Sequence, residues 1–346
     1  MIYNRSLQDD YLDYRRDKDN LIPFLLGRNG INYLIKSLEI KAILLPSYIC
    51  PMVIDIFNHY EVEVFFYQNL NKQLEVPVND ILITLKGIEC SKKLFFLWHD
   101  YLNIVGDMPD ELYDYLKNNN IDSIIDAAHT LPIKNYRCDN VLYGFRKLLN
   151  QPFGSFLKLD KHQNIKQKSY PRTRIWLFCL VYKVKAILYS LFKDFDNKYC
   201  DNLLKFLSGF DKQFSFDISD LFLHEMYSYK KIENLHSSLD YKKICQKRKK
   251  NFLQYHEHLQ NRLSLSKLDI SCPFGFPFIV KDNQEVRKKL WDKGVHSFIL
   301  WHPLNRNSTK EADEYSNYLS HSNIILPVNQ DLSSSDIDKI IEILNA

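Results

Sequence analysis

The chain up to about residue 160 alternates between apolar strand-like runs and amphipathic helix-like segments, and this alternation restricts the fold more than any other feature. The patterns predict strands at 42–45, 62–67, 81–85, 93–98 and 122–125, and helices at 30–38, 51–60 and 110–118. Such an order predicts a mainly parallel sheet with helices on both faces. Ligands of these sheets bind at the carboxyl ends of the strands, where Pro46-Ser47-Tyr48 and Asp126 stand.

The remainder of the chain follows another pattern. Residues 161–263 are charged, rich in aromatic residues and helix-like, with almost no glycine. The C-terminal part predicts strands at 270–280, 298–301 and 324–327, a helix at 285–293 that ends at Gly294, and a helix at 333–344. We therefore expect a large α/β domain over residues 1–210 and a small α+β domain over residues 211–346.

Composition excludes several classes of protein. The 346 residues are 45% hydrophobic and 14% aromatic, enough for a large core. The 46 basic and 42 acidic residues are mixed along the chain, so a nucleic-acid partner is not expected. Seven cysteines without a CxxC pair favour neither a disulfide framework nor a zinc site, so we predict no metal. The N-terminus lacks the apolar region of a signal peptide, and a cytoplasmic location is expected.

A carboxylate and a lysine stand where they could serve pyridoxal 5'-phosphate. Asp126 follows the strand expected at 122–125, and Lys147 lies on an expected turn between two strands. A pyridoxal phosphate enzyme needs a lysine amine that binds the cofactor aldehyde covalently and a carboxylate that keeps the pyridine nitrogen protonated. Two simpler interpretations remain open, in which Asp126 caps a turn or a helix and Lys147 is a surface lysine beside Arg146.

The helix that begins near Gly30 offers a site for the cofactor phosphate. Backbone N–H groups at a helix N-terminus and the positive end of the helix dipole favour a dianion. Arg28 and Asn29 precede this helix directly, and Arg28 could add a charge-assisted hydrogen bond.

The order of these motifs resembles that of the DegT/DnrJ/EryC1/StrS-type sugar aminotransferases, a branch of the fold-type-I pyridoxal phosphate enzymes. The resemblance rests on Gly27-Arg28-Asn29-Gly30-Ile31, on Pro46-Ser47-Tyr48-Ile49-Cys50-Pro51, on Asp126-Ala127-Ala128-His129, on Lys147 seven residues before Gly154, and on the stretch Leu326 to Leu332. It implies the fold-type-I α/β fold, with a mainly parallel sheet of the seven-stranded type and a smaller α+β C-terminal domain. It also implies a homodimer with the cofactor near the subunit interface.

The resemblance assigns roles to several residues and also shows departures. It implies that Lys147 is the catalytic lysine, that Asp126 pairs with the pyridinium nitrogen and that His129 lies near the ring and its phenolic oxygen. Cys50 stands where the family stacks an aromatic ring on the cofactor, which leaves Tyr48 as the nearby aromatic residue. The family usually has a small hydroxyl residue in place of Arg28 and a serine in place of Gly144, so one hydroxyl ligand of the phosphate is missing.

The middle of the chain also departs from the family. The Gly-Tyr-Asn-x-Arg-like segment, which reaches the neighbouring subunit's active site in the family, is not found between residues 170 and 260. Residues 175–192 are apolar but contain Lys183 and Lys185, and the unbroken apolar part is too short to span a bilayer. A buried or dimer-packing helix and an interfacial helix that contacts a membrane both remain open for this segment.

The expected activity is amino transfer from an amino acid such as glutamate to a keto sugar. The resemblance alone implies the substrate class, a nucleotide-linked sugar for surface polysaccharide such as O-antigen. The alternatives are a pyridoxal phosphate enzyme for a non-sugar keto compound, and a degenerate homologue that serves as a binding partner. Asp126 and Lys147 count against the degenerate homologue. The family's dehydratase branch has histidine in place of the lysine, so Lys147 counts against that branch.

Overall fold

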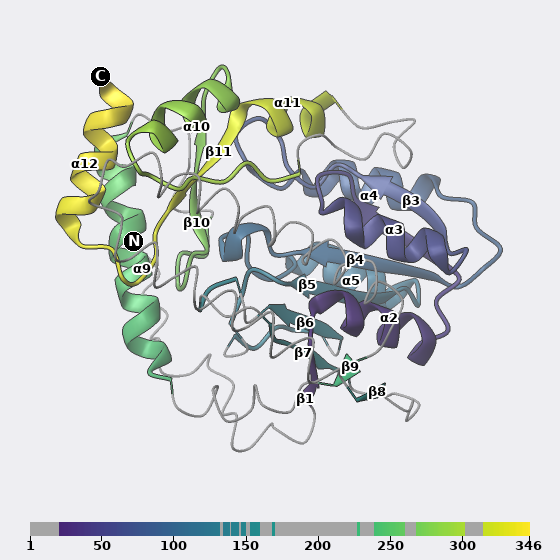
Figure 1. The fold of residues 1–346 in the computed structure, drawn as a ribbon. Coiled ribbons are helices and arrows are strands. Elements are labelled where there is room, and N and C mark those ends of the chain that lie inside the picture. Colours follow the sequence, from purple (N-terminus) through teal and green to yellow (C-terminus); the bar gives the residue numbers. More distant parts are fainter. Residues whose placement is uncertain are drawn as a thin grey trace.

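The central element of the protein is a nine-stranded sheet, whose strands β3 to β7 run across the right-hand half of Figure 1. The computed structural model describes residues 21–131, 134–138, 140–144, 147–149, 153–159, 168–169, 227–228, 239–259, 268–301 and 314–346. The strands are β1 (Leu21–Phe24), β2 (Ala42–Pro46), β3 (Glu63–Tyr67), β4 (Leu94–His99), β5 (Asp122–Ala127), β6 (Val141–Gly144), β7 (Ser155–Lys158), β8 (Lys168–Ser169) and β9 (Tyr227–Ser228). Their order in the sheet is β3-β2-β4-β5-β6-β7-β1-β9-β8.

Seven strands of this sheet form the mainly parallel unit that the sequence predicted. Strands β3, β2, β4, β5 and β6 pair in parallel, and β7 lies antiparallel between β6 and β1. The two-residue strands β8 and β9 extend the sheet beyond β1. The expected α/β fold class is therefore confirmed.

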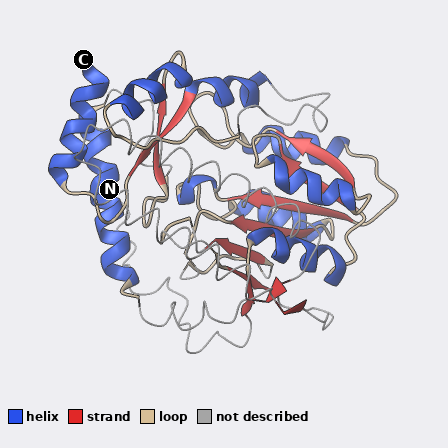
Figure 2. Ribbon diagram, viewed as in Figure 1, coloured by secondary structure: helices blue, strands red, loops and turns tan. Residues whose placement is uncertain are grey.

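Helices cover both faces of the sheet, as the continuous apolar runs of its inner strands require (Figure 2). Helices α2 (Gly27–Ser37) and α3 (Pro51–His59) pack on one face, and α4 (Val78–Gly87) and α5 (Asp110–Asn118) on the other. Successive side chains of β4 point to opposite faces of the sheet and pack in the two hydrophobic cores on those faces. Phe95 and Leu97 pack with α2 and α3, whereas Phe96 and Trp98 pack with α4 and α5.

The strand expected at 81–85 is wrong, because these residues belong to helix α4. Ile81, Leu82 and Leu85 are buried, while Ile83 is 68% exposed. Burial at the first, second and fifth residues with exposure of the third follows a helical period, not the alternation of a strand. The run of β-branched residues favoured a strand, but packing against the sheet decides the local structure.

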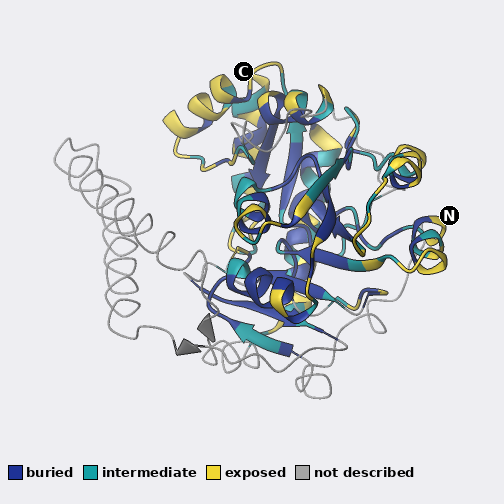
Figure 3. Ribbon diagram, turned by 90° about the vertical axis from the view of Figure 1, so that its right-hand side faces the viewer, coloured by how far each residue is buried: buried dark blue, intermediate teal, exposed yellow. Residues whose placement is uncertain are grey.

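A second layer of structure comes from the C-terminal part of the chain. Strands β10 (Gly275–Ile279) and β11 (Asn323–Pro327) pair antiparallel, and with them lie α9 (Tyr241–His258), α10 (Asn283–Asp292), α11 (Glu314–Ser322) and α12 (Ser334–Asn345). The sequence places the N-cap of α12 at one of Ser333 to Ser335 and the end of α10 at Gly294, and both are confirmed. The Ser333 hydroxyl accepts a hydrogen bond from the Asp336 N–H, and Gly294 follows α10 with a φ of 77°. In Figure 3 the innermost strands and the inner helix faces are buried.

One strand expected in the C-terminal part is not formed, and two further expectations concern residues outside the described ranges. The strand expected at 298–301 is reduced to a single bridge between Phe298 and Ile325, since Trp301 has a left-handed φ of 55° that ends extended backbone. The predicted domain boundary at 210/211 and the apolar segment 175–192 lie outside the described residues. Among the helices described, none is both long and apolar enough to cross a membrane.

Two glycines allow the elements around the end of β6 to approach closely. A Cβ on Gly144 would overlap the backbone carbonyl of Ala128, which follows β5. A Cβ on Gly30 would lie 2.7 Å from Cδ1 of Leu142, the mobile end of a side chain. The first clash involves backbone and cannot be relieved locally, whereas the second can be relieved by a rotation of the leucine.

We predict that Gly144→Ala lowers the free energy of unfolding by about 3 kcal/mol, the upper part of the usual range for overpacking. Gly30→Ala should cost less, because the helix preference of alanine, about 1 kcal/mol, offsets part of the clash. Gly87→Ala is the matched control, since a Cβ there meets no atom within 4 Å. Urea unfolding measures all three, and equal losses for Gly144→Ala and Gly30→Ala would contradict the prediction.

Candidate functional site

Asp126 is a buried carboxylate at the carboxyl end of β5, with only 5% of its surface exposed. One oxygen accepts a hydrogen bond from the Ala128 N–H at 3.0 Å, and the other lies 3.3 Å from Nδ1 of His99. Burial by itself raises the pKa of Asp126, but the charge and hydrogen bond of His99, the charge of Lys147 and the Ala128 N–H together lower it below its usual value. The carboxylate is therefore ionised at neutral pH.

His129 is a neutral imidazole three residues further on. Its Nδ1 accepts a hydrogen bond from the Leu102 N–H at 3.3 Å, so the proton of the ring is on Nε2. Burial and then the charges of Lys147 and His99 lower the pKa of His129 well below its ordinary value. Nε2 is buried and has no hydrogen-bond partner among the described residues. A buried N–H donor of this kind is suited to an acceptor on a bound ligand.

Lys147 lies in the turn that joins β6 to β7, as the sequence predicted, and its side chain is exposed. Its charge acts on both Asp126 and His129. Three of the residues expected in the site are thus brought together by the ends of β5 and β6. An exposed amine beside a buried carboxylate and a neutral imidazole can act as a nucleophile or exchange a proton.

Aromatic rings from the C-terminal part of the chain cover this group. Phe274 stacks on the His129 ring at a centroid distance of 4.8 Å. Trp301 lies 5.3 Å from the His99 ring and 6.1 Å from the His129 ring. The ring centroids of Tyr48 and Trp301 are 4.7 Å apart, with the two rings in an edge-to-face arrangement. The rings exclude water from the two histidines, which strengthens electrostatic interactions there.

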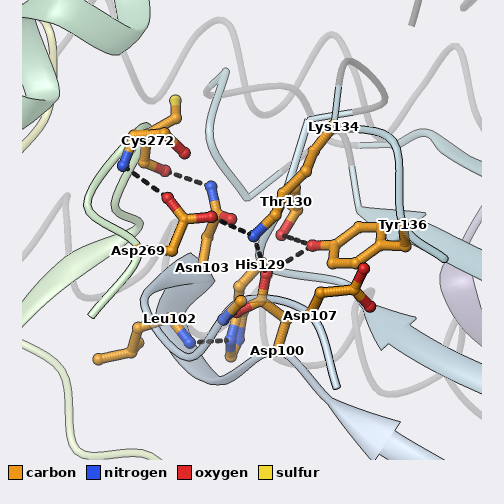
Figure 4. Close-up of polar contacts among 12 residues, drawn as sticks. Asp100, Leu102, Asn103, Asp107, His129, Thr130, Lys134, Tyr136, Asp269 and Cys272 are labelled. Carbon is orange, nitrogen blue, oxygen red and sulfur yellow. Dashed lines mark hydrogen bonds and ion pairs between the residues drawn. The ribbon is translucent and has the colours of Figure 1, made fainter. Parts of the chain in front are cut away.

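A network of buried polar groups, shown in Figure 4, lies beside the same strand ends. Asp100 is fully buried and accepts from Tyr136 at 2.5 Å, and its carboxylate lies 3.1 Å from Nζ of Lys134. Lys134 also pairs at 2.6 Å with Asp269, which leads into the C-terminal strands. Tyr136 lies 3.2 Å from the Thr130 hydroxyl, next to His129. The network therefore connects the residues that follow β4 and β5 to the C-terminal part.

Arg28 and Asn29 lie in the first turn of α2, where the phosphate was expected. Asn29 is fully buried, and its side-chain oxygen accepts a hydrogen bond from the Leu26 N–H at 3.0 Å, so Asn29 caps the helix. The Gly154 N–H donates to the Leu25 carbonyl at 2.8 Å. This hydrogen bond and the packing of α2 on β6 and β7 place the start of the helix beside the end of the Lys147 turn.

Two expected contributors to the site have other surroundings. Cys50 is half-buried directly before α3 and packs at the edge of the α2–α3 core. Tyr48 is fully buried, and its hydroxyl donates to the Leu300 carbonyl at 3.2 Å. Gly144 cannot become the serine that the resemblance would suggest, because Ala128 occupies the space of its side chain. The absence of a hydroxyl side chain at position 144 therefore follows from the close packing of β5 against β6.

Sequence reasoning missed His99 and Trp301. His99 could have been found in the same way as Asp126, because each residue ends an apolar strand and the two are direct neighbours in the parallel register. Trp301 gave no such signal, since its place depends on how the C-terminal part packs on the sheet.

We predict that His129→Asn reduces the loss of stability at low pH. The folded protein keeps His129 neutral, whereas the unfolded chain takes up a proton as the pH falls below about 6.5. The free energy of unfolding should then fall with decreasing pH by up to about 1.4 kcal/mol per pH unit for this group alone. Asparagine can still accept from Leu102, so the local structure should persist.

Urea unfolding of the two proteins between about pH 5 and pH 8 measures this contribution. Burial also lowers the pKa of His296, so only the difference between the two proteins reports on His129. Identical pH slopes would show that His129 accepts a proton in the folded state.

Comparison with known proteins supports the fold. No protein-family model matches the sequence. No curated protein sequence matches it either. Among solved structures, the aminotransferase TlmJ from Streptoalloteichus hindustanus is similar with a TM-score of 0.62 at 12% identity, over 94% of this chain and 85% of TlmJ.

Two further structures agree. A DegT DnrJ EryC1 StrS aminotransferase from Brucella abortus has a TM-score of 0.60 at 11% identity, over 97% of this chain and 91% of that protein. DesI, solved in the presence of its TDP-sugar product, has a TM-score of 0.60 at 11% identity, over 94% of this chain and 79% of DesI. The chain therefore has the fold of the DegT/DnrJ/EryC1/StrS-type aminotransferases, as its motifs predicted.

Proposed function

We propose that this protein is an aminotransferase that uses pyridoxal 5'-phosphate bound through Lys147. The observation that carries the proposal is the group formed by ionised Asp126, neutral His129 and the nearby Lys147 amine, where the His129 Nε2–H has no partner among the described residues. These groups supply what the ring of the cofactor requires. The fold shared with solved aminotransferases supports the same activity.

The residues present fit the cofactor at three points. The Asp126 carboxylate would pair with the protonated pyridine nitrogen, and the His129 Nε2–H would donate to the phenolic oxygen. Backbone N–H groups in the first turn of α2 would hold the phosphate, with Arg28 in place of the missing hydroxyl ligand. When bound, pyridoxal phosphate accepts the amino group and takes up the electron pair released at the substrate carbon.

The side chains then have separate tasks. The Lys147 Nζ would accept the proton from the α-carbon of the amino donor and, as a general acid, would deliver it to the carbon of the cofactor that takes the amino group. His99 keeps the Asp126 carboxylate ionised. Phe274 and Trp301 exclude water from His129, which preserves its neutral form. The chain's own contribution is thus to orient the cofactor and to control one proton.

The proposed substrate is a keto sugar, with an amino acid such as glutamate as donor. DesI, a protein of similar fold, was solved with its TDP-sugar product, which favours a nucleotide-linked sugar here as well. We place the reaction in the cytoplasm, on precursors of surface polysaccharide such as O-antigen, and expect a homodimer. A non-sugar keto compound is the alternative substrate.

A catalytically degenerate homologue is the second candidate function. The observation that favours it is the backbone contact that keeps a serine out of position 144 and so removes one expected ligand of the phosphate. Such a protein would retain the fold as a binding partner without turnover. Purified protein incubated with pyridoxal phosphate and glutamate separates the two functions, since only the enzyme converts glutamate to 2-oxoglutarate.

We predict that Lys147→Ala abolishes covalent attachment of pyridoxal phosphate, because the amine that binds the aldehyde is gone. Borohydride reduction followed by peptide mass spectrometry measures the attachment. Lys158→Ala, at the end of β7, is the control and should retain the label. A labelled peptide from Lys147→Ala would show that another lysine binds the cofactor.

We also predict that Asp126→Asn leaves the cofactor bound but slows turnover by about a hundred- to a thousandfold, the scale for the loss of one preorganised electrostatic contact. The amide can still accept from the Ala128 N–H but cannot hold a proton on the pyridine nitrogen. Asp122→Asn, at the exposed start of the same strand, is the matched control. Normal turnover in Asp126→Asn would remove Asp126 from this role.

A further inference from the structure

Arg248 is a buried cation that the proposed chemistry does not use. It lies on α9, the green helix at the left of Figure 1, and is only 1% exposed. Five lysines on the same helix, Lys242, Lys243, Lys247, Lys249 and Lys250, are exposed or half-buried. A single cation turned into the core of an otherwise basic helix requires a specific set of partners.

Among the described residues, every hydrogen-bond acceptor of Arg248 is an oxygen of a neutral group. Nη2 donates to the Leu148 carbonyl at 2.9 Å, and Nη1 donates to the carbonyls of Pro273 and Phe274, both at 3.2 Å. Nε donates to Oε1 of Gln330 at 2.9 Å. Within the described part of the chain, Arg248 forms no salt bridge. Burial lowers the pKa of Arg248, but a guanidinium remains protonated in proteins.

Two of these oxygens belong to the candidate site. Leu148 follows Lys147 directly, and it is buried although Lys147 is exposed. Phe274 carries the ring that stacks on His129. One planar guanidinium therefore joins the turn that carries the lysine to the segment that covers the histidine. Nε2 of Gln330 supports the same turn, since it lies 3.4 Å from the Leu148 carbonyl.

Arginine suits this position better than lysine. Its donors point in fixed directions in one plane and can reach separate carbonyls at the same time. Hydrogen bonds from a charged donor are also stronger than those between neutral groups, most of all where water is excluded. The described part of the β6–β7 connection, residues 147–149, is thus hydrogen-bonded to a residue that lies 100 positions away from Leu148 in the sequence.

We propose that Arg248 is a positioning residue that holds the β6–β7 turn in place and so sets the Lys147 amine relative to Asp126 and His129. The part of this inference that concerns catalysis rests on the proposed function. The hydrogen bonds from Arg248 to the Leu148, Pro273 and Phe274 carbonyls do not depend on any cofactor or reaction.

The test uses the full-length protein with three substitutions on α9. Arg248→Met removes the hydrogen-bond donors. Arg248→Lys keeps the charge but not the planar set of donors that reaches several carbonyls. Lys250→Met removes a charge from the exposed face of α9 and is the matched control. Hydrogen–deuterium exchange of the peptide that contains residues 147–149 reports on the turn. Acetic anhydride labelling of the Lys147 amine across a range of pH reports on its reactivity and apparent pKa.

In Arg248→Met, we expect the 147–149 peptide to exchange about ten- to a hundredfold faster, the scale for the loss of a hydrogen bond to a charged group. The labelling profile of Lys147 should shift as well. Arg248→Lys should lie between this variant and the wild type, and Lys250→Met should match the wild type. If Arg248→Met does not fold, the comparison of Arg248→Lys with Lys250→Met decides the outcome.

Unchanged exchange and unchanged labelling in both Arg248 variants would overturn the inference. A uniform increase of exchange over the whole chain, with an unaltered labelling profile of Lys147, would also overturn it, because Arg248 would then be only a stabilising residue. The proposed function is tested separately, by binding of pyridoxal phosphate to the wild type. If the wild type does not bind the cofactor, the proposed function fails, while the exchange data still decide the role of Arg248.

Discussion

The ionised carboxylate of Asp126 is the constraint to which the rest of the site responds. A buried negative charge is costly unless it is compensated, and here His99, the Lys147 charge and a backbone N–H share that task. His99 can take part because β4 and β5 are parallel neighbours in register, so the two residues meet at the same sheet edge. The parallel pairing of β4 with β5 is thus enough to bring His99 next to Asp126, whatever the conformation of the loops. Burial, together with the charges of Lys147 and His99, lowers the pKa of His129 and keeps it neutral, so one arrangement fixes the protonation of two groups.

The C-terminal part of the chain completes this site from the other side. Lys134 joins Asp100 to Asp269, and Arg248 joins the Lys147 turn to the segment of Phe274. The first connection is an ion-pair network, and the second is a cation held by carbonyl oxygens. Removing one partner of either would leave a buried polar group unsatisfied, which costs more than the interaction itself contributes. These contacts therefore oppose movement of the C-terminal part relative to the sheet, close to Asp126, His129 and Lys147.

Much of this arrangement could be predicted from the sequence, since it depends on local pattern. The apolar runs ending at Asp126, the turn of Lys147 and the caps of α10 and α12 all follow from short stretches of chain. The strand expected at 81–85 was wrong because burial on one side of a helix overrode a β-branched composition. The roles of Trp301 and Arg248 depend on contacts between distant segments, which no local pattern encodes.

The end of β6 shows how packing can require a departure from a family pattern. The Ala128 carbonyl fills the space of a side chain at position 144, so glycine there is a consequence of how closely β5 and β6 approach. This packing explains the glycine, but it also leaves a phosphate without one expected hydroxyl ligand. Arg28 lies in the first turn of α2, where a positive charge and a helix N-terminus favour the same dianion. A phosphate held there would depend less on a single hydroxyl, and its binding would be more sensitive to salt than in a site built from neutral donors.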